Sequence, residues 1–103
     1  MTSELYDHPL YRALLHTSKR AAPYMLEADL DGAAWVYRPH RRLLTVSPMC
    51  SDAALALGLA TALAASTHHL GNGPIVSRDD RQDCVWPAFA ALYATHRRLQ
   101  DTP

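Results

Sequence analysis

The chain has 103 residues, with ten basic and ten acidic side chains and a formal net charge of zero. That length favours a single domain over residues 1–103, and a hydrophobic content of 49% is enough for a core without disulfides or metal. The even charge balance lacks the strongly basic character that is typical of nucleic-acid-binding proteins. Arginine supplies most of the basic residues and alanine is frequent, a composition typical of GC-rich, actinobacterial-type genomes.

The sequence carries no pattern of a targeting segment or a membrane span. The N-terminal MTSELYDHP lacks the basic start and the apolar run of a secretory signal. The central uncharged stretch at residues 53–67 is shorter than the ~18 to 20 apolar residues that cross a bilayer. Cys50 and Cys84 form no C-x-x-C pair, and we expect both to be reduced. These features predict a soluble cytoplasmic domain.

The first predicted helix covers residues 9–21. Pro9 follows a capping residue, and a proline in the first turn is typical of a helix start. Leu10 and Leu14 then recur on one face, which we expect to be buried. Pro23 prevents the helix from continuing because its ring blocks the helical backbone bond.

The next segment, YMLEADL, alternates with a period of two, which predicts a half-buried strand. Asp31-Gly32 follows it and is a strong hairpin signal, because a type I′ turn needs positive φ at both central residues. With these two residues as the loop, Ala28 pairs with Trp35. The large aromatic side chains then share a face with the apolar residues of the first strand.

The stretch YRPHRRLLTVSP predicts a second hairpin directly after the first. Pro39 suits a type I turn, and a loop at residues 39–42 places Tyr37 opposite Leu44. The two hairpins together predict a three-stranded antiparallel meander. The residues expected on its inward face are Leu26, Ala28, Leu30, Trp35, Tyr37, Leu44 and Val46.

Two further helices are predicted at residues 52–67 and 83–99, with a short edge strand at Ile75 and Val76 between them. The helix at 52–67 is apolar almost all round, so we expect it to be buried on more than one side. The sequence therefore predicts an α+β fold, a three-stranded antiparallel meander with flanking helices in the order α-β-β-β-α-α.

Two surfaces of this predicted fold favour a homodimer. One side of the helix at 52–67 carries only small residues four positions apart, which lets another backbone approach closely. The outer face of the meander would leave an apolar patch exposed. The residues expected at a dimer interface are Ala54, Gly58 and Ala62 on the helix, or Met25, Val36 and Leu43 on the sheet.

No pattern of a catalytic, metal or cofactor site is present. Cys50 precedes a helix, where the helix dipole lowers a thiol pKa, but the spacing supplies no base to activate it. Histidines and cysteines are dispersed and lack zinc-site spacing. The acidic run at residues 79–83 lacks the calcium-loop pattern. We expect no catalytic residue, no metal and no cofactor, and hence a non-enzymatic protein.

The strongest local charge is a group of four residues, Arg38, His40, Arg41 and Arg42, which we call the basic tip. Basic hairpins of this kind contact phosphates in nucleic-acid-binding proteins. The alternative is a solvated turn without a ligand. In the predicted meander Arg38 lies near Glu27, whereas Arg41 and Arg42 should be exposed and unnecessary for stability.

DLDGAAWVYR and RLLTVSP, followed by DAALALGLATALA, resemble the YbaB/EbfC family of nucleoid-associated proteins over residues 29–65. That resemblance implies a DNA-binding dimer. The helix-strand order also resembles double-stranded-RNA-binding domains, but SDAA at residues 51–54 stands where that family has a lysine-rich helix entry. We expect a small regulatory or protein-interaction domain that acts as a homodimer. The alternative is a nucleic-acid-binding protein that uses the basic tip.

Overall fold

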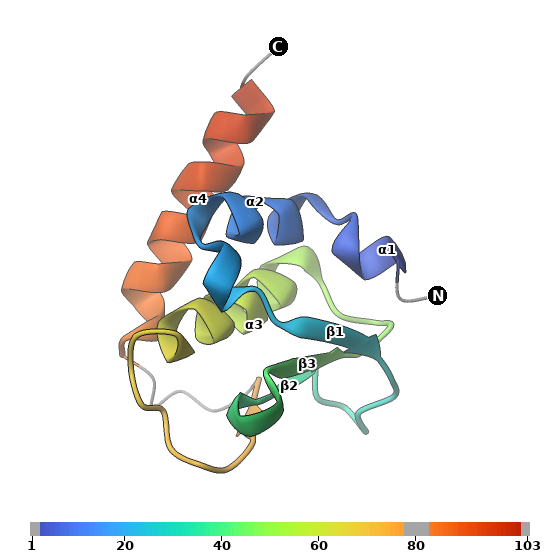
Figure 1. The fold of residues 1–103 in the computed structure, drawn as a ribbon. Coiled ribbons are helices and arrows are strands. Elements are labelled where there is room, and N and C mark those ends of the chain that lie inside the picture. The colour runs from blue at the N-terminus through green and yellow to red at the C-terminus, as the bar shows by residue number, and fades with distance from the viewer. Residues whose placement is uncertain (1–2, 78–82, 102–103) are drawn as a thin grey trace.

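The computed structural model describes residues 3–77 and 83–101 of the chain. It is an α+β fold in which the helices lie on one side of a four-stranded mixed sheet (Figure 1). The helices are α1 (Ser3–Tyr6), α2 (Pro9–Thr17), α3 (Asp52–Ala65) and α4 (Val85–Asp101). The strands are β1 (Tyr24–Glu27), β2 (Trp35–Arg38), β3 (Leu43–Val46) and β4 (Ile75–Val76), and two 3-10 turns are η1 (Lys19–Ala21) and η2 (Pro39–Arg41).

Helix α2 begins where the sequence predicts but ends four residues earlier. The ring Nδ1 of His8 accepts a hydrogen bond from the backbone N–H of Leu10 at 3.1 Å, which caps the first turn. Ser18 is extended, with φ −162° and ψ 104°, and η1 follows it. The predicted helix at 9–21 is therefore right for residues 9–17 and wrong for the remainder, where the chain turns towards the sheet.

The prediction of a three-stranded antiparallel meander is wrong in its first strand. Strand β1 pairs in parallel with β3, and the sheet order is β1-β3-β2-β4. Strand β3 lies between β1 and β2, the two strands that the sequence-based prediction pairs with each other. Its sequence, LLTV, is buried at three of its four positions, which suits a strand that is hydrogen-bonded along both edges.

The Asp31-Gly32 turn nevertheless forms. Asp31 and Gly32 have φ values of 53° and 93°, and the N–H of Ala33 donates to the carbonyl of Leu30 at 3.2 Å. Residues 28–34 connect β1 to β2 around the end of β3 instead of closing a two-stranded hairpin. On one side Ala28 donates to the Val46 carbonyl, and on the other Ser47 donates to the Ala34 carbonyl. A correct local turn therefore joins strands that do not pair.

The parallel pairing reverses which side chains of β1 face the core. Parallel register places Met25 beside Leu44, so Met25 is 4% exposed in the core, whereas Leu26 is 43% exposed. The prediction of Leu26 inside and Met25 outside is wrong for this reason. Ala28 and Leu30 lie beyond the strand in the connection to β2 and are half-buried.

The second hairpin and the edge strand are confirmed. Trp35 pairs with Val46 and Tyr37 with Leu44, as the four-residue loop predicts, and all four side chains are buried. Strand β4 pairs antiparallel with β2 and forms the other edge of the sheet. Because β3 separates β1 from β2, Arg38 pairs with Leu43, and the expected neighbourhood of Arg38 and Glu27 is wrong.

Helix α3 packs against the sheet through Trp35. The hydroxyl of Ser51 caps this helix by accepting from the N–H of Ala54 at 3.2 Å. A Cβ at Gly58 would lie 3.1 Å from carbons of the Trp35 ring, so the indole rests directly on the glycine backbone. On its other sides α3 packs against α2 and α4, so the expectation of a helix buried on more than one side is confirmed.

We predict that Trp35→Ala costs about 3 to 5 kcal/mol of unfolding free energy, because it removes a large buried side chain and leaves a cavity over Gly58. Urea denaturation followed by circular dichroism measures the loss. Trp86→Ala is the matched control, since Trp86 is 58% exposed and should cost less than about 1 kcal/mol. Equal losses in the two variants would contradict the packing of Trp35 on α3.

Candidate functional site

The structure divides the basic tip between two hollows. A guanidinium nitrogen (Nη2) of Arg42 donates to the backbone carbonyl of Arg20 in η1, which turns this side chain away from the rest of the tip. The other three tip residues border a hollow of about 140 Å³ beside the loop that follows α3. The tip residues around that hollow are Arg38, His40 and Arg41. Arg41 and Arg42 are exposed, as the sequence predicts.

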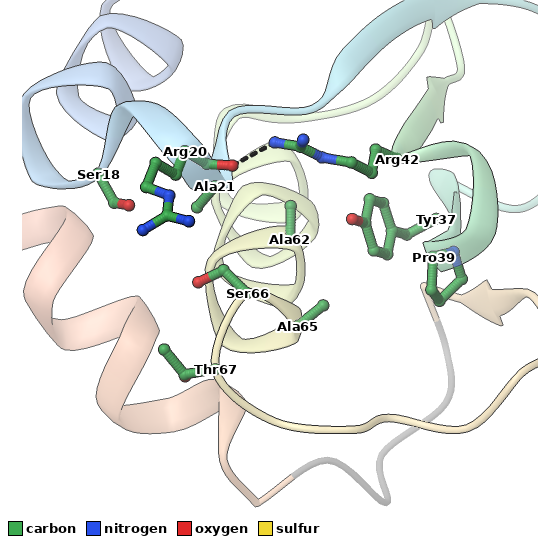
Figure 2. A pocket seen from close by; sticks show the side chains of 10 residues that line it. All are labelled: Ser18, Arg20, Ala21, Tyr37, Pro39, Arg42, Ala62, Ala65, Ser66 and Thr67. Atoms are coloured by element: carbon green, nitrogen blue, oxygen red, sulfur yellow. Dashed lines mark hydrogen bonds between the residues drawn. The ribbon is translucent and has the colours of Figure 1, made fainter.

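Arg42 belongs to a larger hollow of about 640 Å³, which we call the arginine cleft. It lies between η1, the β2–β3 hairpin and the C-terminal end of α3 (Figure 2). Arg20 and Arg42 reach it from opposite sides, and Ala62 and Ala65 line it from α3. None of the ten residues that line the cleft has a carboxylate. The cleft is therefore cationic at neutral pH.

Tyr37 places a polar group in this cleft from the core. Its side chain is 3% exposed, and Figure 2 shows its hydroxyl directed into the cleft between Arg42 and α3. Burial raises the pKa of the Tyr37 hydroxyl, and the charge of Arg42 partly offsets that rise. The hydroxyl is therefore a neutral donor at physiological pH.

Hydroxyl groups also occupy the end of α3. Ser66 donates to the Leu63 carbonyl at 2.6 Å, and Thr67 contacts the Ala64 carbonyl at 3.4 Å. The last carbonyls of a helix carry partial negative charge and lack backbone partners. The two hydroxyls cover some of that negative charge where it faces the cleft.

The small residues of α3 lie inside the chain. Gly58 is covered by Trp35, Ala62 is 1% exposed, and Ala54 is half-buried. A close approach of a second chain along this stripe would require Trp35 to leave. The homodimer itself remains a prediction, and the outer sheet face is the other surface that the sequence indicates for it.

The outer sheet face carries a patch that differs from the predicted one. The strand register places on it Tyr24, Leu26, Val36, Arg38, Leu43, Thr45 and Val76. Val36 and Thr45 are buried at its centre, whereas Tyr24 is 67% exposed and Leu26 is 43% exposed on β1. Sequence reasoning missed these two residues because it assigned their side of β1 to the inner face of the sheet.

The free edge of β1 is partly closed. The backbone N–H of Met25 points away from β3 and donates to the hydroxyl of Tyr6 in α1 at 2.9 Å. An open edge strand invites pairing with another chain, and natural proteins often cover such edges. Here the short N-terminal helix supplies the cover.

The pKa of the Cys50 thiol is raised, whereas a reactive cysteine has a lowered thiol pKa. Burial raises the pKa of its thiol, and the nearby carboxylate of Asp52 raises it further. Both causes disfavour the thiolate form that a nucleophilic cysteine needs. Cys84 is half-buried and also free.

No three histidine, cysteine or acidic side chains gather at a point that could hold a metal ion within residues 3–77 and 83–101. His8 and Asp52 form a pair, with 3.1 Å between the ring Nε2 and a carboxylate oxygen. The acidic residues Asp79 and Asp80 lie outside the described residues. In the described part of the chain, no helix is both long enough and apolar enough to cross a membrane.

Comparison of the chain with protein families, with curated proteins and with solved structures gives no match. Functional proposals therefore depend on the surfaces described above.

The two arginines of the tip should differ in their effect on stability. We predict that Arg41→Ala changes the unfolding free energy by less than about 0.5 kcal/mol, the norm for an exposed side chain. Arg42→Ala should cost more, between about 0.5 and 1 kcal/mol, because it loses the hydrogen bond to Arg20. Chemical denaturation of both variants tests the order, and a larger loss for Arg41→Ala would contradict it.

Proposed function

We propose that this chain is a non-enzymatic protein-interaction domain that acts as a homodimer through the outer sheet face. The exposed pair Tyr24 and Leu26 carries the proposal. Two large apolar side chains, two positions apart on one strand, form the start of a continuous apolar surface with Leu43 and Val76. Exposed apolar patches of this kind mark interaction sites on soluble proteins.

A second copy of the chain is the partner that this face suits best. In a twofold dimer the same patch meets itself, so an apolar face needs no complementary charge on another protein. Contact through the face also agrees with the bond from Met25 to Tyr6, which hinders pairing through the β1 edge. Of the seven residues that the strand register places on the outer face, only Arg38 is charged, and it lies at the end nearest the hairpin loop.

We predict that Leu26→Glu converts the dimer to a monomer, because a carboxylate at the interface would be desolvated and paired with its own symmetry mate. Light scattering coupled to gel filtration gives the mass of each variant. Met49→Glu is the control, since Met49 is 89% exposed but lies in the β3–α3 connection away from the sheet face. A monomeric wild-type chain at high concentration would refute the proposal.

Nucleic-acid binding through the basic tip is the second candidate. His40 and Arg41 are exposed at the end of the hairpin, and neither makes an ion pair with another described residue. A projecting pair of this kind can reach a phosphate backbone without displacing other contacts.

If the tip binds nucleic acid, Arg41→Ala should weaken binding to all sequences equally and reduce the salt slope by about one unit for each lost phosphate contact. Fluorescence anisotropy with mixed DNA and RNA at several salt concentrations measures both quantities. Arg97→Ala, at an exposed position of α4, is the control for general charge. Equal effects of the two variants would argue against a specific role for the tip.

A further inference from the structure

The arginine cleft has a charge pattern that calls for an anion. Arg20 and Arg42 line it from two different elements, and no lining residue offers a carboxylate to neutralise them. Arg20 makes no ion pair within the described residues, and neither does Arg42. Two guanidinium groups that share one hollow repel each other, so a ligand that carries negative charge would stabilise the arrangement.

Tyr37 gives a second and independent indication. The structure has two other tyrosines in the core region whose hydroxyls are satisfied: Tyr11 donates to the Pro23 carbonyl at 3.0 Å, and Tyr6 accepts from Met25. The hydroxyl of Tyr37 makes no hydrogen bond to another described residue and is open to the cleft, although the residue as a whole is only 3% exposed. This hydroxyl is therefore available as a donor to a molecule in the cleft.

The cleft is also partly preorganised. The bond from Arg42 to the Arg20 carbonyl uses one of the five N–H groups of the guanidinium and ties this side chain to η1 (Figure 2). A side chain that is already fixed loses less conformational entropy when a ligand binds. The remaining N–H groups of Arg42 are free to donate.

The donors favour a phosphate group over a carboxylate. Figure 2 shows Arg42 and Tyr37 on one side of the cleft and Arg20 on the other, where its guanidinium would have to turn towards them to share a ligand. A phosphate monoester offers three terminal oxygens that can each accept from a different donor. A carboxylate has only two oxygens in one plane. Ala62 and Ala65 provide a small apolar surface beside the donors, on which an organic group can lie.

We propose that the arginine cleft binds the phosphate group of a small phosphorylated molecule, with Arg20, Arg42 and Tyr37 as its donors. A volume of about 640 Å³ suits a ligand of the size of a mononucleotide. The site lies within one chain and on the helix side of the sheet, so it depends neither on the outer sheet face nor on the exposed end of the tip.

Titration of the isotope-labelled protein with adenosine 5′-monophosphate, followed by amide chemical shifts, tests the proposal. Inorganic phosphate and adenosine are the two comparison probes. We expect saturable shifts around the cleft with the monophosphate, weaker saturable shifts with inorganic phosphate, and none with adenosine. Arg20→Gln should weaken binding of the monophosphate by about tenfold or more, as loss of a charged hydrogen bond does. Tyr37→Phe should weaken binding of the monophosphate by about threefold to tenfold.

Matched controls separate a built site from general attraction. Lys19→Gln and Arg41→Gln each remove one positive charge next to a cleft arginine, but neither residue lines the cleft, so both should retain binding. The proposal is overturned if these controls weaken binding as much as Arg20→Gln. It is also overturned if adenosine alone gives the same shifts, or if neither phosphate probe gives a saturable shift at millimolar concentration. The dispersion of amide signals confirms that each variant is folded.

Discussion

The contact between the Trp35 ring and the Gly58 backbone sets the position of everything around it. A side chain at residue 58 would hold the helix away from the sheet, because even a methyl group would lie 3.1 Å from the indole. With glycine there, α3 approaches β2 closely enough for its C-terminal end to lie beside Tyr37. The helix and strand that meet at this contact also supply Ala62, Ala65 and Tyr37 to the arginine cleft.

Local signals in the sequence were sufficient for the β2–β3 hairpin and failed for β1. A four-residue loop brings its two strands together with only one sensible register, and apolar alternation checks it. In β1 both Met25 and Leu26 are apolar, so alternation does not decide which faces the core. The Asp-Gly turn forms with its expected φ values whether or not its flanking strands pair. The pairing depends on β3 lying between β1 and β2, and the whole of β2 separates β1 from β3 along the chain.

The same limit applies to the candidate sites. Clustering along the sequence selected Arg42 as a candidate site residue, but it grouped Arg42 with neighbours that face another hollow. Arg20 and Tyr37 join Arg42 only through tertiary structure, from the end of the first helical segment and from the core face of β2. A charged residue close after a helix end was the available signal for Arg20. No sequence pattern distinguishes the hydroxyl of Tyr37, which faces the cleft, from that of Tyr11, which donates to a backbone carbonyl.

The placement of β3 between β1 and β2 has a consequence for the order of folding. Strand β1 precedes the other strands in the chain, but its partner in the sheet is β3 and not the next strand, β2. The β2–β3 hairpin needs only a short loop, and short loops close with little loss of chain entropy. Folding therefore favours the hairpin as the first part of the sheet, and β1 docks onto its exposed edge afterwards. We therefore expect an element that leaves the ribosome early to join the sheet only after the hairpin has formed.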